Sequence, residues 1–167
     1  MSQLPMSANL KNNKGDRQSR NERHTFVLVH GGWCGGWIWR YVAPALRERG
    51  HVVTTPTSTD LGERRHVGNR IATLSTHIED IVAHIEMEGF QDVTLVSQSY
   101  GGMVATGTLA RIRSMIYLDA FVPEDGKSLV DCLSPELRAQ FIMYKDEDRP
   151  IPPLPLSYLG ITDPVLV

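Results

Sequence analysis

The chain has 167 residues, a formal net charge of -2, and 41% hydrophobic and 22% charged residues. This length suits one domain with its own core, and this composition is that of a globular protein rather than a disordered or fibrous one. The near-neutral charge and the scattered basic residues give no reason to expect nucleic acid or an acidic membrane surface as a partner.

Cysteine usage and terminal composition point to the cytoplasm. Cys34 and Cys132 are far apart and lack metal-ligand spacing, so both are expected to be reduced thiols. Residues 1–23 are polar, without the apolar segment of a secretory signal, and are predicted to form a disordered tail. Since no stretch is apolar over the length of a membrane span, we expect no membrane partner.

From residue 25 onward, short apolar runs alternate with segments of helical period. The expected elements in chain order are a strand at 26–29, a helix at 37–49, a strand at 51–55, a helix at 70–88, a strand at 93–96, a helix at 101–110 and a strand at 115–118. The continuous apolar runs suit strands buried on both faces of a sheet. The alternation predicts an α/β fold with a mostly parallel sheet and flanking helices.

A serine lies between the third expected strand and a helix of small residues. A sharp strand-to-helix turn at such a point exposes the serine hydroxyl, and it needs small residues two positions before and two positions after that serine. Ser97 and Gly101 stand at those two positions around Ser99, although glycine is commoner at the first of them. Ser99 is therefore the candidate nucleophile. The alternative is that Ser99 only caps the helix.

His30-Gly31-Gly32-Trp33 follows the first expected strand. A loop at this place supplies one backbone N–H to an oxyanion hole, and the residue after the nucleophile supplies the other. Gly32 and Tyr100 are the expected donors. Taken alone, the loop could also be an ordinary strand-ending turn. His30 is expected to be a structural histidine rather than a general base.

These residues resemble an α/β-hydrolase family that contains bacterial EstC-like esterases, plant methyl esterases and plant hydroxynitrile lyases. The matching segments are Phe26 to Trp39, Val93 to Gly102 and Ile116 to Pro123. The resemblance implies the α/β-hydrolase fold and a serine hydrolase that acts on small carboxylic esters through an acyl-enzyme at Ser99. It implies no cofactor and no metal.

Two positions refine the resemblance. The lyases usually carry threonine where this chain has Gly31, which favours an esterase. Members usually have histidine before the nucleophile, where this chain has Gln98. The candidate pocket or supporting residues are His30, Gly31, Trp33, Gln98 and Asp119. Asp119, at the end of the fourth expected strand, is either a pocket-lining carboxylate or the acid of a triad.

No histidine follows Ser99, because all six lie at positions 24, 30, 51, 66, 77 and 84. A triad of this fold runs in the chain order Ser, then Asp or Glu, then His. After the disordered tail at 1–23, the resemblance therefore implies a partial hydrolase core at 24–126 and the truncated start of a cap region at 127–167. We expect weak or no activity, and an unpaired apolar edge strand around Ile116.

Three alternatives stay open. The chain could be a non-catalytic small-molecule-binding protein on the same fold, or an enzyme similar to a hydroxynitrile lyase. It could also be an enzyme completed by another chain or by an unusual base such as His77 or His84, which are otherwise expected to face solvent. The sequence does not specify the ester substrate or the oligomeric state.

Overall fold

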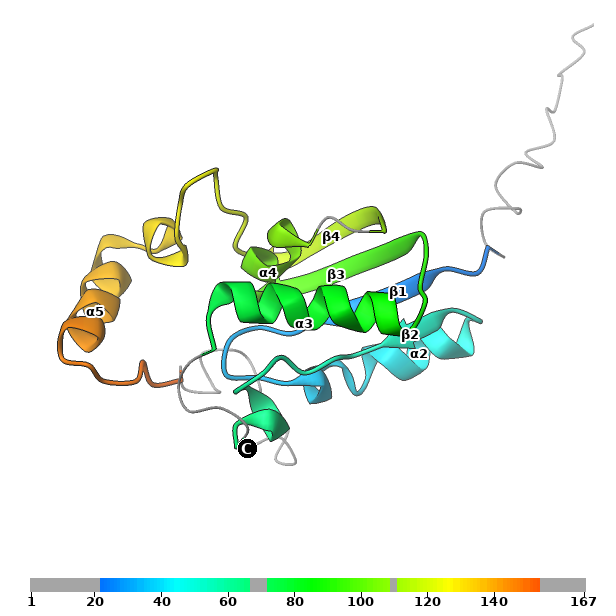
Figure 1. Ribbon diagram of the computed structural model, residues 1–167, viewed down its shortest axis with the longest axis horizontal. Helices are drawn as coiled ribbons and strands as arrows, with labels where there is room; N and C mark the ends of the chain where they lie inside the picture. Colours follow the sequence, from blue (N-terminus) through cyan, green and yellow to red (C-terminus); the bar gives the residue numbers. More distant parts are fainter. Residues whose placement is uncertain (1–21, 67–71, 109–110, 154–167) are drawn as a thin grey trace, which may run out of the picture.

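The computed structural model describes residues 22–66, 72–108 and 111–153 (Figure 1). Residues 1–21, which make up most of the expected disordered tail, lie outside the described residues, as do residues 154–167 of the expected cap region.

Four parallel strands form the sheet, in the order β2-β1-β3-β4. The strands are β1 Thr25–Val29, β2 Val52–Thr54, β3 Val93–Ser99 and β4 Ile112–Ala120. Every residue of β3 from Val93 to Ser97 is buried, as expected for a central strand covered on both faces. The predicted α/β class with a parallel sheet is confirmed.

Helices cover both faces of this sheet. On one face, α3 Leu74–Met87 and α4 Gly101–Gly107 bury Ile81, Ile85 and Val104 against β1 and β3, and α3 crosses the near face in Figure 1. On the other face, η2 Gly36–Trp39 and α2 Val42–Glu48 bury Trp39 and Ala43. These buried side chains on the two faces of the sheet hold the carboxyl ends of β1 and β3 in fixed positions.

The helix predicted at 37–49 is wrong as a single element. The segment forms the 3-10 turn η2 and then α2, which begins at Val42. Pro44 explains the break, because proline lacks the N–H that a helix interior needs and is tolerated only near the helix start. In α2 it is the third residue, where an N–H has no intrahelical partner.

The helix predicted at 70–88 begins later, at Leu74. Thr73 caps it: its side chain accepts a hydrogen bond from the Thr76 backbone N–H at 3.3 Å, and the Thr76 hydroxyl accepts from the Thr73 N–H at 3.1 Å. This reciprocal capping box marks a helix start more strongly than the apolar period alone. Residues 67–71 lie outside the described residues.

Among the described residues, strand β4 forms one edge of the sheet, and it is longer than the predicted strand at 115–118. It pairs with β3. Met115 and Tyr117 pack against the core, whereas Ile116 and Leu118 are 47% and 51% exposed. The expected apolar edge around Ile116 is therefore present.

Beyond β4 the chain forms η4 Leu129–Cys132 and α5 Pro135–Asp146, which stands away from the sheet (Figure 1). None of the residues of α5 is buried. Cys34 and Cys132 are both free, as predicted. None of the helices in the described part of the chain has the length and apolar character of a membrane span.

Candidate active site

Ser99 lies at the turn between β3 and α4. It is the last residue of β3 and has a φ of 52°, in the left-handed region that non-glycine residues seldom adopt. The Phe121 backbone N–H donates to the Ser99 carbonyl at 3.0 Å and holds this conformation. The N-cap residue of α4 is Tyr100, with no side-chain capping bond, so the interpretation of Ser99 as a simple cap is wrong.

Small residues flank Ser99, as the turn requires. Ser97 is fully buried beneath β4, with its hydroxyl 3.4 Å from the Ile116 carbonyl oxygen. A β-carbon at Gly101 would lie 2.7 Å from the His30 carbonyl oxygen, closer than atoms pack in proteins. The start of α4 can therefore approach β1 only because residue 101 is glycine.

The loop after β1 lies directly beside this turn. A β-carbon at Gly31 would collide with the Gln98 side chain and lie 3.1 Å from the Ser99 β-carbon. A β-carbon at Gly32 would be 3.7 Å from that of Tyr100. The structure thus brings the two expected amide donors together, with Gly32 beside Tyr100, the residue that follows Ser99.

The same loop is fixed from the side of η3 Gly62–Arg64. The Gly36 N–H donates to the Thr57 hydroxyl at 2.8 Å, and that hydroxyl donates to Oε1 of Glu63 at 2.6 Å. The hydrogen bond from Thr57 lowers the pKa of Glu63. A β-carbon at Gly62 would lie only 2.8 Å from the α-carbon of Gly35, so the two loops are in backbone contact.

His30 is buried, 1% exposed, at the carboxyl end of β1. Its Nε2 accepts from the Ser58 N–H at 3.1 Å, so Nδ1 carries the proton and donates to the Gly31 carbonyl at 2.7 Å. Burial lowers the pKa of His30. Both ring nitrogens are therefore engaged by backbone groups, which favours the predicted structural role over that of a general base.

The expectation that His77 and His84 face solvent is wrong. His77 is 7% exposed and bonds the Thr59 carbonyl through Nε2 at 2.9 Å and the Tyr100 hydroxyl through Nδ1 at 2.8 Å. His84 is half-buried, with Nε2 3.0 Å from the Thr54 hydroxyl, and burial lowers its pKa. Both histidines therefore lie on the packed face of α3.

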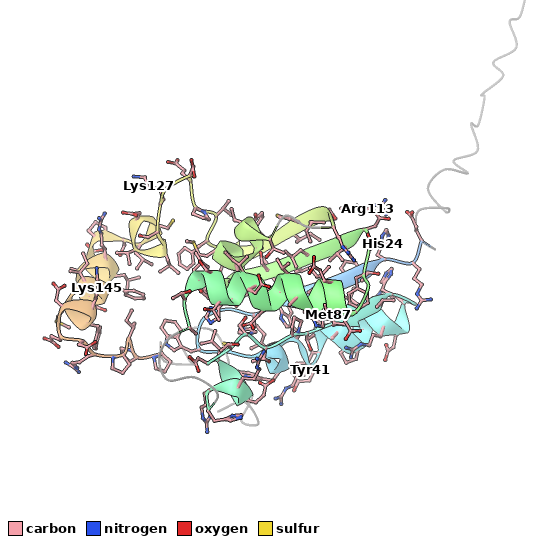
Figure 2. All side chains as sticks on the ribbon, viewed as in Figure 1. His24, Tyr41, Met87, Arg113, Lys127 and Lys145 are labelled. Atoms are coloured by element: carbon pink, nitrogen blue, oxygen red, sulfur yellow. The ribbon has the colours of Figure 1, made fainter. Side chains whose placement is uncertain are left out.

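The other three histidines are not partners of Ser99 either. His24 and His51 lie together at the amino ends of β1 and β2, whereas Ser99 is at a carboxyl end. In Figure 2, His24 and Arg113 lie at the end of the sheet opposite Lys127 and Lys145. His66 is exposed, with Nδ1 3.0 Å from the Glu63 carbonyl.

Trp33 and Asp119 lie at the rim of the site. Trp33 has a φ of 59° and is 40% exposed, and its indole N–H donates to the Ile151 carbonyl at 3.0 Å. It thus joins the loop after β1 to the segment beyond α5. Asp119 is exposed and has a φ of 45°, and its side chain makes no hydrogen bond or ion pair within the described residues.

The sequence did not predict the hydrogen-bond network beneath Tyr100, which consists of His77, Thr59 and Asp80. Asp80 accepts from the Thr59 N–H at 2.6 Å and from the Thr59 hydroxyl at 3.0 Å. His77 shares the four-residue spacing of the buried Ile81 and Ile85, which is a signal that it faces the core. Its partners come from distant segments and have no such signal.

The described residues hold no cluster of metal ligands, and a cavity among them lies away from Ser99. No group of three or more His, Cys, Asp and Glu residues that could hold a metal ion occurs in the described ranges. A cavity of 290 Å³ lies between η2, α2 and Glu63, and Trp37, Trp39 and Arg47 are among the residues that line it. It includes none of the candidate site residues.

Comparisons with known proteins agree with this geometry. Residues 26–164 match the model of the Alpha/beta hydrolase family. The chain is 54% identical over 125 residues to a carbendazim hydrolyzing esterase of Nocardioides sp. (strain SG-4G), covering 70% of this chain and 52% of that one. It is 29% identical over 107 residues to an alpha-hydroxynitrile lyase of Arabidopsis thaliana, covering 61% of this chain and 42% of the relative.

A solved structure gives the same result. An extracellular alpha/beta-hydrolase from a Paenibacillus species superposes with a TM-score of 0.70 at 30% identity, covering 77% of this chain and 55% of that one. The chain spans about half the length of the relatives that it matches. The parallel sheet, the serine turn after β3 and these matches together show that the chain belongs to the alpha/beta hydrolase family.

Proposed function

We propose that this protein hydrolyses small carboxylic esters through an acyl-enzyme at Ser99. The observation that carries the proposal is the left-handed backbone of Ser99, φ 52°, at the β3–α4 turn beside Gly31 and Gly32. Strained residues of this kind cluster at active sites. The similarity to a named esterase over half of that relative's length supports the same activity.

In the proposed reaction, the Ser99 hydroxyl oxygen attacks the carbonyl carbon of the ester, and the carbonyl oxygen becomes an oxyanion. The backbone N–H groups of Gly32 and Tyr100 donate to that oxyanion. The bond from carbon to the alkoxy oxygen then breaks, and the alcohol leaves with the proton that Ser99 lost. Water cleaves the acyl-serine in a second step and releases the carboxylic acid.

This reaction needs a base for the Ser99 proton. All six histidines are among the described residues, and none of them hydrogen-bonds to Ser99 there. His30 and His77 have both ring nitrogens occupied. We therefore propose that the 167-residue chain turns over slowly. Oxyanion stabilisation and binding alone leave an acceleration of roughly 10³–10⁴-fold over water in serine hydrolases that lack triad residues.

Residue 31 favours ester hydrolysis over a lyase reaction. The resemblance implies a threonine hydroxyl at this position in the lyases, whereas Gly31 supplies no hydroxyl, and a β-carbon there would lie 3.1 Å from the Ser99 β-carbon. A non-catalytic binding protein is the other alternative, and the labelling experiment below distinguishes it. The cytoplasmic location and the absence of cofactor, nucleic-acid and membrane partners stay predictions.

The test uses p-nitrophenyl acetate with and without added imidazole, which can act as a soluble general base. We expect slow acetylation of Ser99, detected by mass spectrometry of the digested protein, and a faster rate when imidazole is present. Ser99→Ala is expected to show neither the acetyl group at residue 99 nor any imidazole effect above the rate without protein. Equal rates in wild type and Ser99→Ala would contradict the proposed nucleophile and favour the binding-protein alternative.

A further inference from the structure

Tyr100 is tied to α3 by its side chain. Its hydroxyl lies 2.8 Å from Nδ1 of His77, and the two rings meet edge to face with centroids 5.7 Å apart. Burial raises the pKa of Tyr100 to about 12, so the phenol keeps its proton at neutral pH. The contact joins residues 23 positions apart in the sequence.

The direction of this hydrogen bond follows from the other side of the imidazole. Nε2 of His77 lies 2.9 Å from the Thr59 carbonyl oxygen, which can only accept, so Nε2 carries the proton. Nδ1 of the neutral ring is then an acceptor, and the Tyr100 hydroxyl donates to it. The order is Tyr100 O–H to His77, and His77 N–H to Thr59.

The far end of this chain of hydrogen bonds is anchored too. Asp80, one turn along α3 from His77, accepts from both the N–H and the hydroxyl of Thr59 at 2.6 and 3.0 Å. Arg64 donates to the Thr59 hydroxyl at 3.2 Å and lies 3.9 Å from Asp80. Thr59 is thereby held on α3, and it fixes the ring plane of His77.

We propose that His77 and the Tyr100 phenol form a positioning pair that orients the Tyr100 backbone N–H toward the oxyanion. The inference rests on the proposed function, because that N–H is one of its two donors. The amides at a helix start have no intrahelical partner, so helical hydrogen bonds do not orient them. The Tyr100 side chain supplies that constraint, on the residue next to the strained Ser99.

A purely structural role of the Tyr100–His77 pair predicts a different experimental result from a positioning role. His84 lies on the same helix, two turns beyond His77, and forms a similar pair with the hydroxyl of Thr54 in β2, at 3.0 Å. Thr54→Val and Tyr100→Phe each remove one hydroxyl from a histidine of α3 while keeping the shape of the side chain. If both pairs only stabilise the packing of α3, the two variants should behave alike.

The experiment measures two quantities in wild type, Tyr100→Phe and Thr54→Val. The first is the rate constant for Ser99 acetylation at saturating p-nitrophenyl acetate with imidazole, together with its KM. The second is the ¹⁵N order parameter of the Tyr100 amide, which needs no activity. We expect Tyr100→Phe to lower the rate constant at least about tenfold with little change in KM, since small displacements of a catalytic group cost that much or more.

The amide itself should report the same difference. We expect an order parameter near about 0.85 in wild type and in Thr54→Val, and a clearly lower value in Tyr100→Phe. Equal rate constants and equal order parameters in the two variants would overturn the positioning role, and so would a mobile Tyr100 amide in wild type. Failure of the proposed function gives a separate result, namely a wild-type rate in Ser99→Ala, and it would remove the oxyanion role of the pair as well.

Discussion

The first turn of α4 packs on the backbone of β1 through Gly101, whose position would place a β-carbon 2.7 Å from the His30 carbonyl oxygen and 3.0 Å from that of Val29. Both contacts are to backbone atoms, which cannot rotate away as a side chain does. The strained turn at Ser99 is therefore held between Gly101 on one side and Phe121 on the other.

Gly101→Ala should consequently destabilise the protein, since overpacking against fixed atoms typically costs about 1–3 kcal/mol. Gly32→Ala is the matched control for stability, because its β-carbon would meet its nearest neighbour at an ordinary 3.7 Å. Urea unfolding of both variants measures the difference. Equal free energies of unfolding would show that α4 shifts easily and that the contact with β1 is not tight.

Substitution of Asp60 is expected to stabilise the protein. Both of its carboxylate oxygens are buried without a hydrogen-bond partner within the described residues, and its φ is 64°. Asp60→Gly removes an unpaired buried group, which costs about 1–3 kcal/mol, and relieves the backbone strain. The greater freedom of glycine in the unfolded chain offsets part of that gain. We expect a net increase of about 1 kcal/mol in the free energy of unfolding.

Asp92→Gly separates the effect of the backbone strain from that of the buried carboxylate. Asp92 also has a positive φ, 52°, but it is exposed, so this substitution relieves strain without removing a buried carboxylate. A smaller gain in Asp92→Gly than in Asp60→Gly is expected in thermal melts of the two variants. If Asp60→Gly melts at a lower temperature than wild type, the Asp60 carboxylate has a stabilising partner in solution.

The open edge at β4 predicts self-association. Ile116 and Leu118 are half exposed beside a row of backbone groups that pair with no other described strand, and such edges promote aggregation. Leu118→Lys should slow the rise of light scattering at 37 °C, roughly severalfold, because a charged side chain on an edge opposes strand addition. Met143→Lys, on α5, changes a side chain of 45% exposure away from the sheet and should have little effect.

Buried histidines predict a loss of stability in mild acid. Burial lowers the pKa of His30 from its usual 6.5, so the unfolded chain binds more protons than the folded one below that pH. The contribution of neutral His30 to the free energy of unfolding is therefore fully present above pH 6.5. It is lost as the pH falls toward the lowered pKa of the folded state. The half-buried His84 acts in the same direction.

His30→Gln should flatten this dependence, since glutamine offers an acceptor and a donor but does not titrate. Urea unfolding at pH about 7.5 and about 5.5 gives the slope for wild type, His30→Gln and the exposed control His66→Gln. A slope in His30→Gln as steep as in wild type would assign the acid sensitivity to other groups.

The strands and the serine turn could be predicted from the sequence because each depends on a local pattern. Apolar runs bounded by Gly and Pro mark strands, and a serine with small residues two positions away marks the turn. Pro44 also carried local information, since it is compatible with α2 only in the first turn. The break between η2 and α2 could therefore have been predicted from Pro44, although the helical spacing of the apolar residues indicated one continuous helix.

The network beneath Tyr100 could not be predicted in the same way. The helical period of α3 places His77 on the face of Ile81 and Ile85 but cannot say what it meets there. Its partners, Thr59 and Tyr100, come from a loop and from a turn that only the tertiary fold brings together. Asp60 could not be predicted either, because residue preferences give no reason to expect a buried carboxylate that has no partner among the described residues.

The contact between Gly35 and Gly62 limits how this protein can change over evolutionary time. A β-carbon at Gly62 would lie only 2.8 Å from the Gly35 α-carbon, so position 62 cannot accept a side chain unless the two loops move apart. Such a movement would also shift Gly32, three residues from Gly35. Substitutions are therefore expected to be tolerated better in the exposed residues of α5 than at Gly62.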